Sequence, residues 1–336
     1  MKFGFLVAKQ HPPDVSMVER FREHIAQVRA ARDAGFDLIA MGQHYLSTPF
    51  QEIQTLPSLA RLAAEAGTMR VAATVLLLPL LNPVDVAEQV AALDVICEGR
   101  FVFGVGLGYR DAEYEAFGVQ REARVARLTE GLHVIKRLWA EEEVTHHGRF
   151  FHLTRARLGL KPVQKPHPRI WFAANNDAAV ERAARLGDAW VVNPHAKLSI
   201  LEHQMGLYRK TLQEAGKPFP PELPMIKELY VAPDRRSAVQ ECRPCLEAKY
   251  QAYASWGQDK ALPQEDSFDL AFEDLVRDRF IIGDPDDCVR ELQRYVDALG
   301  VTCFIFRVQW PGMEQAKVLR TIKLLAEHVM PALRER

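Results

Sequence analysis

The sequence predicts an α/β protein of the closed (β/α)8 TIM-barrel class. Eight short apolar runs are spread over the chain, and most are separated by segments with helical periodicity. Continuous apolar runs are typical of parallel strands buried on both faces, which need a crossover between neighbours. The length of 336 residues, 48% of them apolar, suits one barrel domain spanning 1–336, with insertions at about 141–167 and 253–275. A doubly wound open sheet is the alternative with the same alternation.

In the first half of the chain, strands are expected at 2–8, 36–41, 71–78 and 101–105. The intervening helices are expected at 17–34, 56–66 and 83–97. The first of these helices ends at Gly35, and its apolar stripe comprises Val18, Phe21, Ile25 and Val28. The third carries its apolar stripe at Val86, Val90, Leu93 and Cys97.

In the second half, a helix at 122–140 precedes the polar insertion 141–167. Further strands are expected at 169–174, 189–193, 224–232 and 301–308, and further helices at 178–187, 197–215, 234–252 and 314–333. Asp284 followed by Pro285 is typical of a helix start, and that helix is expected to stop at Gly300. Residues 253–275 show no clear pattern and are expected to form a mobile excursion.

Composition argues against several classes of function. Lys and Arg number 43 against 44 Asp and Glu, and no basic run is present, so neither nucleic acid nor a membrane surface is an expected partner. The apolar start is too short for a signal peptide, and the run at 71–81 is too short to span a bilayer. Five cysteines in a long chain do not form a disulfide framework. A soluble cytoplasmic protein is expected.

The candidate site is expected at the carboxyl ends of the strands, where the active sites of such barrels lie. That rule selects Gln10, His11, Gln43, His44, Tyr45, Pro79, Asn82, Gly106, Gly108, Tyr109, Asn175, Asn176, Asp177, Asn193 and His195. We expect substrate contacts from His11, Tyr45, Asn82 and Asn193. His44 is the best candidate for proton chemistry because imidazole titrates near neutral pH, although a strand-end histidine can equally be structural.

Two segments are candidates for holding a ligand. Glycines in 104–108 would let the backbone approach a flat or anionic group, or would merely relieve crowding inside the barrel. Asn175 and Asn176 lead into a helix N-terminus, whose free N–H groups attract phosphate. Ordinary capping by Asn176 or Asp177 is the alternative. Nearby cations are Arg110, Arg124 and Arg127.

Two other patterns do not predict a site. Cys242 and Cys245 have the spacing of a redox motif, but they fall late in a predicted helix. His146 and His147 lie in the insertion without a further ligand set, so no metal site is expected.

Several segments together resemble the bacterial-luciferase-like family of flavin-dependent monooxygenases. The matching text is AGFDLIAMGQHY, VAATVLLLPLLNPVDVAEQVAALDVICEGRFVFGVGLGY, EYEAFGV, LGLKPVQKPHPRIWFAANNDAAVERAARLGDAW and GDPDDCVRELQRYVDALGV. The likeness covers nearly the whole chain in order. It implies a barrel without a metal that forms a homodimer through the helices after strands two and three, here 55–67 and 83–97. It also implies that 253–275 is the family's mobile loop over the active site.

The resemblance also implies roles for particular residues. His44 matches a histidine that assists catalysis, whereas Gln43 and Tyr45 depart from the neighbouring Glu and His of the family. Thr74 and Val75 fall where the family often has a non-proline cis peptide beneath the flavin ring. The remaining cofactor positions carried over are Gly106, where luciferase has a cysteine, Tyr109, Arg124, Asn175, Asn176 and Asp177. Asn82 replaces a histidine, and Leu107 replaces a phosphate-contacting arginine of many FMN-binding members.

Three functions follow from this resemblance. The first is a two-component monooxygenase that receives reduced FMN from a separate NAD(P)H:flavin reductase. It would use O2 to form a C4a-(hydro)peroxide and insert oxygen into a small apolar organic substrate. The second is an F420-dependent oxidoreductase that transfers hydride without oxygen, which Leu107 favours. The third is a non-catalytic flavin-binding protein.

Overall fold

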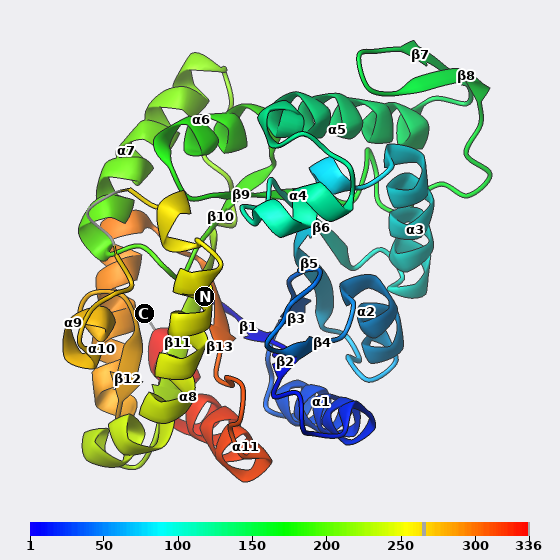
Figure 1. Ribbon diagram of the computed structural model, residues 1–336. Helices are drawn as coiled ribbons and strands as arrows, with labels where there is room; N and C mark the ends of the chain where they lie inside the picture. The colour runs from blue at the N-terminus through cyan, green and yellow to red at the C-terminus, as the bar shows by residue number, and fades with distance from the viewer. Residues whose placement is uncertain (264–266, 335–336) are drawn as a thin grey trace.

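In the computed structural model, which describes residues 1–263 and 267–334, eight parallel strands close into a barrel surrounded by helices (Figure 1). The barrel strands are β1 (Lys2–Leu6), β3 (Leu38–Met41), β5 (Arg70–Leu77), β6 (Phe101–Gly106), β9 (Arg169–Ala174), β10 (Ala189–Val192), β11 (Pro224–Val231) and β13 (Cys303–Arg307). Val192 of β10 pairs with Met225 of β11, and this pairing closes the sheet. The predicted (β/α)8 class is therefore confirmed, and the open-sheet alternative is wrong.

The predicted helices lie close to their expected positions. The helices are α1 (Met17–Asp33), α2 (Thr55–Ala63), α3 (Pro83–Ile96), α4 (Asp111–Ala116), α5 (Arg124–Ala140), α6 (Asp177–Leu186), α7 (Leu198–Glu214), α8 (Arg235–Ser255), α9 (Phe272–Val276), α10 (Pro285–Leu299), α11 (Gln315–Leu324) and α12 (Met330–Arg334). Of these, the short helices α4 and α9 were not predicted. The predicted start of α10 is confirmed, because the Asp284 side chain accepts a hydrogen bond from Asp287 N. Gly300 ends α10 with a left-handed backbone (φ 77°), which glycine adopts without strain.

The apolar stripe predicted for α1 is partly wrong. Val18 is exposed, and the buried face carries His24, Gln27, Val28 and Ala31. Gln27 donates to Gln309 and Gln315, so polar pairs hold this face together with apolar side chains such as Val28 and Ala31. Buried polar groups that find partners in this way can take positions that periodicity assigns to apolar residues.

Several short elements were not predicted from the sequence. β12 (Ile281–Gly283) pairs with the outer part of β11, and β2 (Gln10–His11) pairs antiparallel with β4 (Gln51–Glu52). Within 141–167 the chain forms a hairpin, β7 (Val144–His147) and β8 (His152–Ala156), which projects beyond α5 (Figure 1). Elements of two to five residues carry too few positions for a period to be read.

The glycine exit of β6 is required by packing against β5. A Cβ on Gly104 would lie 2.1 Å from the backbone oxygen of Ala73, and one on Gly106 would lie 2.6 Å from Cγ2 of Val75. The β5–β6 register shifts between Ala73 and Leu76, and the Thr74–Val75 peptide is cis, as the resemblance implied. The crowding interpretation of these glycines therefore holds for both positions.

The segment after β11 differs in part from expectation. Helix α8 continues to Ser255, beyond the predicted end at 252, and a 3-10 turn follows at Asp259–Ala261. Of the expected excursion at 253–275, residues 264–266 lie outside the described part of the chain. Among the described residues, no helix has both the length and the apolar character needed to cross a membrane.

Candidate active site

A cavity of about 270 Å³ opens at the carboxyl ends of the barrel strands. Twelve of the residues expected in the site line it, namely Gln43, His44, Thr74, Val75, Gly106, Gly108, Tyr109, Arg124, Asn175, Asn176, Asn193 and His195. They come from five different strand ends, which the barrel closure brings together. Val75, Ala173, Val191 and Ile226 form an apolar part of its wall.

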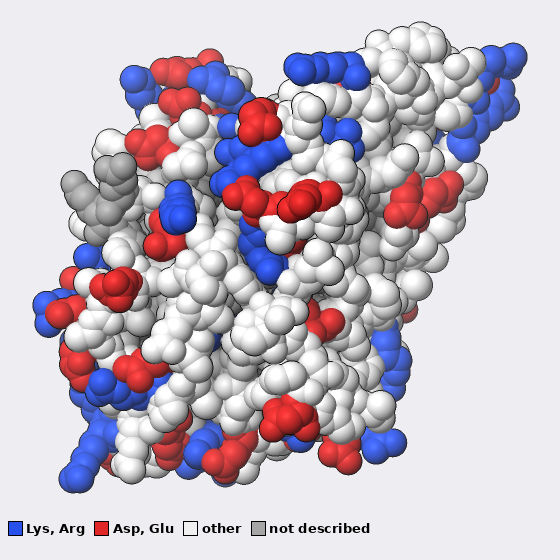
Figure 2. All heavy atoms as spheres, viewed as in Figure 1, with Lys and Arg blue, Asp and Glu red and all other residues white. Residues whose placement is uncertain are grey.

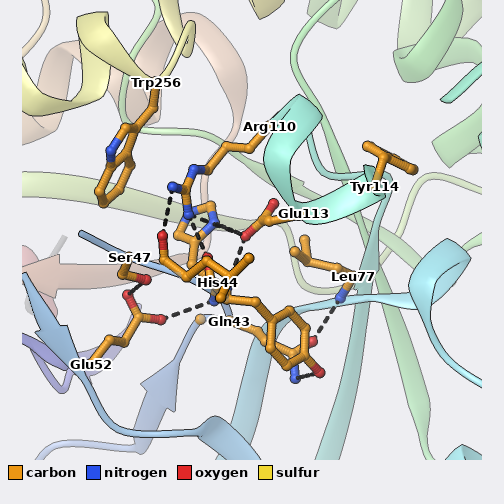
Figure 3. Close-up of polar contacts among 12 residues, drawn as sticks. Gln43, His44, Ser47, Glu52, Leu77, Arg110, Glu113, Tyr114 and Trp256 are labelled. Atoms are coloured by element: carbon orange, nitrogen blue, oxygen red, sulfur yellow. Dashed lines mark hydrogen bonds and ion pairs between the residues drawn. The ribbon is translucent and has the colours of Figure 1, made fainter. Parts of the chain in front are cut away.

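His44 is held by a carboxylate from a different part of the chain (Figure 3). Its Nδ1 lies 3.1 Å from Oε1 of Glu113 on α4, which is fully buried. The same oxygen accepts a hydrogen bond from Tyr45 N at 2.9 Å, and Arg110 lies 3.6 Å away as an ion pair. Since a carboxylate only accepts hydrogen bonds, this contact assigns the His44 proton to Nδ1 and leaves Nε2 with its lone pair.

A second carboxylate fixes the backbone beside His44. Glu52 accepts from His44 N at 2.9 Å and from Ser47 Oγ at 2.8 Å, and it forms a buried ion pair with Lys9. The dashed contacts of Glu52 and Glu113 converge on His44 from two sides in Figure 3. The histidine is therefore positioned through both its ring and its main chain.

Burial favours the uncharged forms of His44 and Tyr109. It lowers the pKa of His44 below its ordinary value, and the positive charge of Lys9 acts in the same direction, while the hydrogen bond to Glu113 opposes both. Burial raises the pKa of Tyr109, whose ring meets the His44 ring edge-on at 5.5 Å. A neutral imidazole beside a neutral phenol can accept or pass on a proton near pH 7.

The opposite end of the cavity is cationic. Arg121 and Arg124 line it near α6, where Asn176 caps Ala179 N at 3.1 Å, and Lys260 is a further cation of the cavity lining. Figure 2 shows Lys and Arg side chains gathered around the hollow beside α4 on this face of the molecule. Free N–H groups of a helix N-terminus and nearby cations together form an anion site.

Unpartnered polar atoms at the wall are consistent with a bound polar ligand. Within the described residues, Thr74 Oγ1, Tyr109 OH and Arg307 Nε are buried without a hydrogen-bond partner, and all three residues line the cavity. Such atoms are costly unless something else satisfies them. The apolar wall, these donors and acceptors and the cationic end fit a flat heterocycle that carries a phosphate. In the described part of the chain, no group of three or more His, Cys, Asp or Glu side chains is placed to hold a metal ion.

Among the residues expected to contact the cofactor or the substrate, His11, Tyr45, Asn82 and Asp177 lie outside the cavity lining, as do Gln10 and Pro79 of the strand ends. His11 is buried with its Nε2 3.0 Å from Nε2 of His24, because β2 turns it toward α1. The Tyr45 ring packs at a tilt against Phe117, and its hydroxyl accepts a hydrogen bond from Gln43 Nε2 at 2.9 Å. Asn82 is exposed and caps α3 through Val84 N, so its side chain serves the helix.

Asp177 also points away from the cavity. Its carboxylate lies 3.3 Å from His203 Nε2, on the outer face of α6. The preceding residue, Asn176, caps α6 and also lines the cavity.

Several residues of the site were not found from the sequence. Glu113 sits in a helix of six residues, and Lys9 follows a short strand, so neither has a periodic signal. Tyr253 from α8 and Arg307 at the end of β13 also line the cavity. The strand-end rule would have selected Lys9 and Arg307 had charged residues inside or directly after each apolar run been included.

The molecule is a closed parallel barrel with a cavity at the carboxyl ends of its strands. The active sites of barrel enzymes lie at the same end. The sequence profile of luciferase-like monooxygenases matches residues 1–302. The chain belongs to this family.

Individual relatives fall into two groups of oxidoreductases. The oxygenase component of a flavin-dependent trigonelline monooxygenase from Acinetobacter baylyi is 24% identical over 100% of this chain and 96% of its own. An F420-dependent glucose-6-phosphate dehydrogenase from Nakamurella multipartita is 29% identical over 91% and 90%. The crystal structure of monooxygenase RslO1 from Streptomyces bottropensis superposes with a TM-score of 0.88 at 26% identity, covering 99% of this chain and 100% of that one. The first of these relatives is flavin-dependent and the second is F420-dependent, so the two groups differ in cofactor.

Proposed function

We propose that the protein is a flavin-dependent monooxygenase that uses reduced FMN and O2 to oxygenate a small organic substrate. The observation that carries this proposal is that the lining of one cavity combines an apolar part, formed by Val75, Ala173, Val191 and Ile226, with a cationic part at Arg124 and the N-terminus of α6. A flavin ring matches the first part and its phosphate the second. The trigonelline monooxygenase component and RslO1 support the oxygenase assignment.

The cofactor would be held by residues from three strand ends. Thr74 and Val75 would lie against the ring, with Gly106 leaving space beside them. Arg124, with Asn175 and Asn176 at the α6 N-terminus, would hold the phosphate. When bound, the reduced flavin supplies the electrons that activate O2.

The protein's own contribution would be proton handling and water exclusion. His44, with its proton on Nδ1 and its pKa lowered by burial, presents Nε2 as a proton acceptor at the cavity. Trp256 lies over Arg110 at 4.2 Å and donates from Nε1 to Thr48 O at 3.0 Å, which ties the end of α8 to the rim next to His44. A covered rim limits the entry of water during the reaction.

Two protein partners belong to this proposal. A separate NAD(P)H:flavin reductase would supply the reduced cofactor, as the term "oxygenase component" of the relative indicates for that system. A second copy of this chain would pack on α2 and α3, where Val84, Val95 and Ile96 are exposed apolar residues. Light scattering of the purified protein, together with a Val95→Glu, Ile96→Glu variant, tests the homodimer.

Anaerobic titration with oxidised and reduced FMN tests the proposal. Reduced FMN is expected to bind and, after O2 is admitted, to support oxygenation of members of a panel of small organic compounds. Failure to bind FMN in either form would reject the proposal. Flavin binding without oxygenation of any compound would favour a non-catalytic flavin-binding protein.

An F420-dependent oxidoreductase is the second candidate function. It is favoured by Leu107, an apolar residue at the cavity wall, and by the F420-dependent relative at 29% identity. Binding of F420 in preference to FMN, with substrate turnover that needs no O2, would establish this candidate and reject the monooxygenase.

A further inference from the structure

Arg307 is a cation at the cavity wall with unused hydrogen-bonding capacity. It ends β13 and borders both the main cavity and a small polar chamber next to it. Its Nη1 donates to Tyr253 OH at 3.3 Å, whereas its buried Nε has no acceptor among the described residues. A guanidinium has five N–H donors, so Arg307 faces the cavity with donors in reserve.

The carboxylate nearest to Arg307 is already engaged. Glu228 is fully buried, and its Oε1 forms an ion pair with Lys249, while its Oε2 accepts from Trp310 Nε1 at 2.6 Å. Arg307 reaches the same Oε1 only at 3.7 Å. Glu228 therefore pairs more closely with Lys249 than with Arg307.

The charges around this end of the cavity do not balance. Glu52 is matched by Lys9, and Glu113 by Arg110, so Glu228 remains for both Lys249 and Arg307. This excess of positive charge also affects Lys249, whose pKa is lowered to about 7, first by burial and then by the charge of Arg307. An anion next to Arg307 would relieve this excess of positive charge.

Arg307 lies across the barrel from the cationic end that faces α6. In the ring of eight strands, β13 is four positions from β6 in either direction, and Arg121 and Arg124 follow β6. One phosphorylated cofactor occupying the α6 end therefore leaves the anion requirement at β13 unmet. Between the two ends lies the apolar wall of Val75, Val191 and Ile226.

We propose that Arg307, backed by Lys249, binds a carboxylate group of the organic substrate, whose carbon skeleton lies along the apolar wall toward His44. A planar guanidinium matches a carboxylate with two parallel hydrogen bonds, and this makes the pairing specific as well as strong. The inference rests on the proposed function and narrows its substrate class to small carboxylic acids. It replaces the expectation of a purely apolar substrate.

Matched pairs of acids and neutral amides test this inference. Acetate with acetamide, butyrate with butyramide, and benzoate with benzamide are titrated by calorimetry into the protein, with and without FMN. At least one acid is expected to bind roughly tenfold or more tighter than its amide, because a charge-assisted pair replaces a neutral one. No preference for the acid in any of the pairs would overturn the proposal.

Variants of Arg307 and Arg124 test whether Arg307 causes the preference for the acid. Arg307→Gln is expected to abolish the preference for the acid and to change FMN affinity less than threefold. If this variant does not fold, Arg307→Lys takes its place and should retain part of the preference for the acid. Arg124→Gln should do the reverse, weakening FMN and keeping the preference. A preference that survives in Arg307→Gln, or a parallel loss of FMN affinity in that variant, would overturn the proposal. Acid binding by a protein that fails to bind FMN would reject the proposed function and leave the carboxylate site standing.

Discussion

His44 Nδ1 and Glu113 Oε1 lie 3.1 Å apart, although the two residues are separated by 69 positions in the chain. His44 follows β3 and Glu113 lies in α4 after β6, so the closed barrel brings them together. The Oε2 atom of Glu113 is buried without a partner among the described residues, which leaves Oε1 as the atom that orients the ring. The tautomer of the candidate catalytic histidine thus depends on a residue in another βα unit.

Replacing Glu113 with Gln should lower turnover without removing flavin binding. The amide retains the size of the side chain but no longer dictates which ring nitrogen of His44 carries the proton. A loss of about tenfold or more in kcat is expected, within the range of positioned acid–base groups. Steady-state kinetics and FMN titration measure the two effects, with the exposed Glu115→Gln on the same helix as control. Unchanged kcat in Glu113→Gln would show that the contact is structural only.

The pH dependence of turnover should reflect a neutral His44. Its pKa is lowered by burial from the ordinary 6.5, so most of the imidazole is expected to be unprotonated at neutral pH. Product yield should therefore decline toward acid with a midpoint below pH 6.5, and His44→Ala should bind flavin but lose product. A pH–rate profile with an acid limb above pH 7 would contradict this protonation state, as would full product yield from the alanine variant.

Arg124→Gln should distinguish FMN from riboflavin. Arg124 lines the cationic end of the cavity, where only the phosphorylated cofactor offers an anion. FMN affinity is expected to fall about tenfold, the size of a lost charge-assisted hydrogen bond, while riboflavin affinity stays constant. Fluorescence titration with both flavins measures this, and the exposed Arg185→Gln on α6 is the control. Equal weakening of both flavins would place the phosphate elsewhere.

The contact between Gly106 and Val75 can be tested by compensation. Gly106→Ala would place a Cβ 2.6 Å from Val75 Cγ2 and should destabilise the protein by about 1–3 kcal/mol through overpacking. Adding Val75→Ala removes the colliding atom and should recover part of that loss. Urea unfolding of the single and double variants gives the coupling free energy. Additive effects of the two changes would argue against the close packing of β5 on β6.

Acid should destabilise the protein through a buried histidine pair. Burial lowers the pKa of His11 to about 4 and that of His24 to about 3, from an ordinary value of 6.5. Between pH 6.5 and 4 the unfolded chain takes up protons that the folded chain refuses, so the free energy of unfolding falls as the pH falls. The slope is at most about 1.4 kcal/mol per pH unit for each histidine.

His24→Gln should make this slope shallower in urea unfolding measured from pH 7 to pH 5. The exposed His147→Gln serves as the control and should leave the slope unchanged. An identical slope in His24→Gln and the parent protein would mean that other groups cause the acid sensitivity.

Much of the architecture could be predicted because barrel strands are buried on both faces and therefore appear as continuous apolar runs. All eight barrel strands lie within two residues of the predicted ends, and the start of α10 follows from Asp284 and Pro285. The stripe of α1 could not be predicted, because Gln27 is buried by its pairing with Gln309, which is distant in sequence. Short elements such as β12 and α4 were missed for lack of a period.

For the candidate site, the sequence by itself determined which strand ends carry chemically useful groups. His44, Tyr109, Asn176 and Asn193 could be selected because the barrel places all carboxyl ends of its strands at one mouth. Only the tertiary structure decided that His11 and Asn82 face elsewhere, that Glu113 orients His44, and that Arg307 lies across the barrel from Arg121 and Arg124. The physical reason is that strand position determines which end of the barrel a residue reaches. Side-chain direction and pairing depend instead on contacts between segments far apart in the chain.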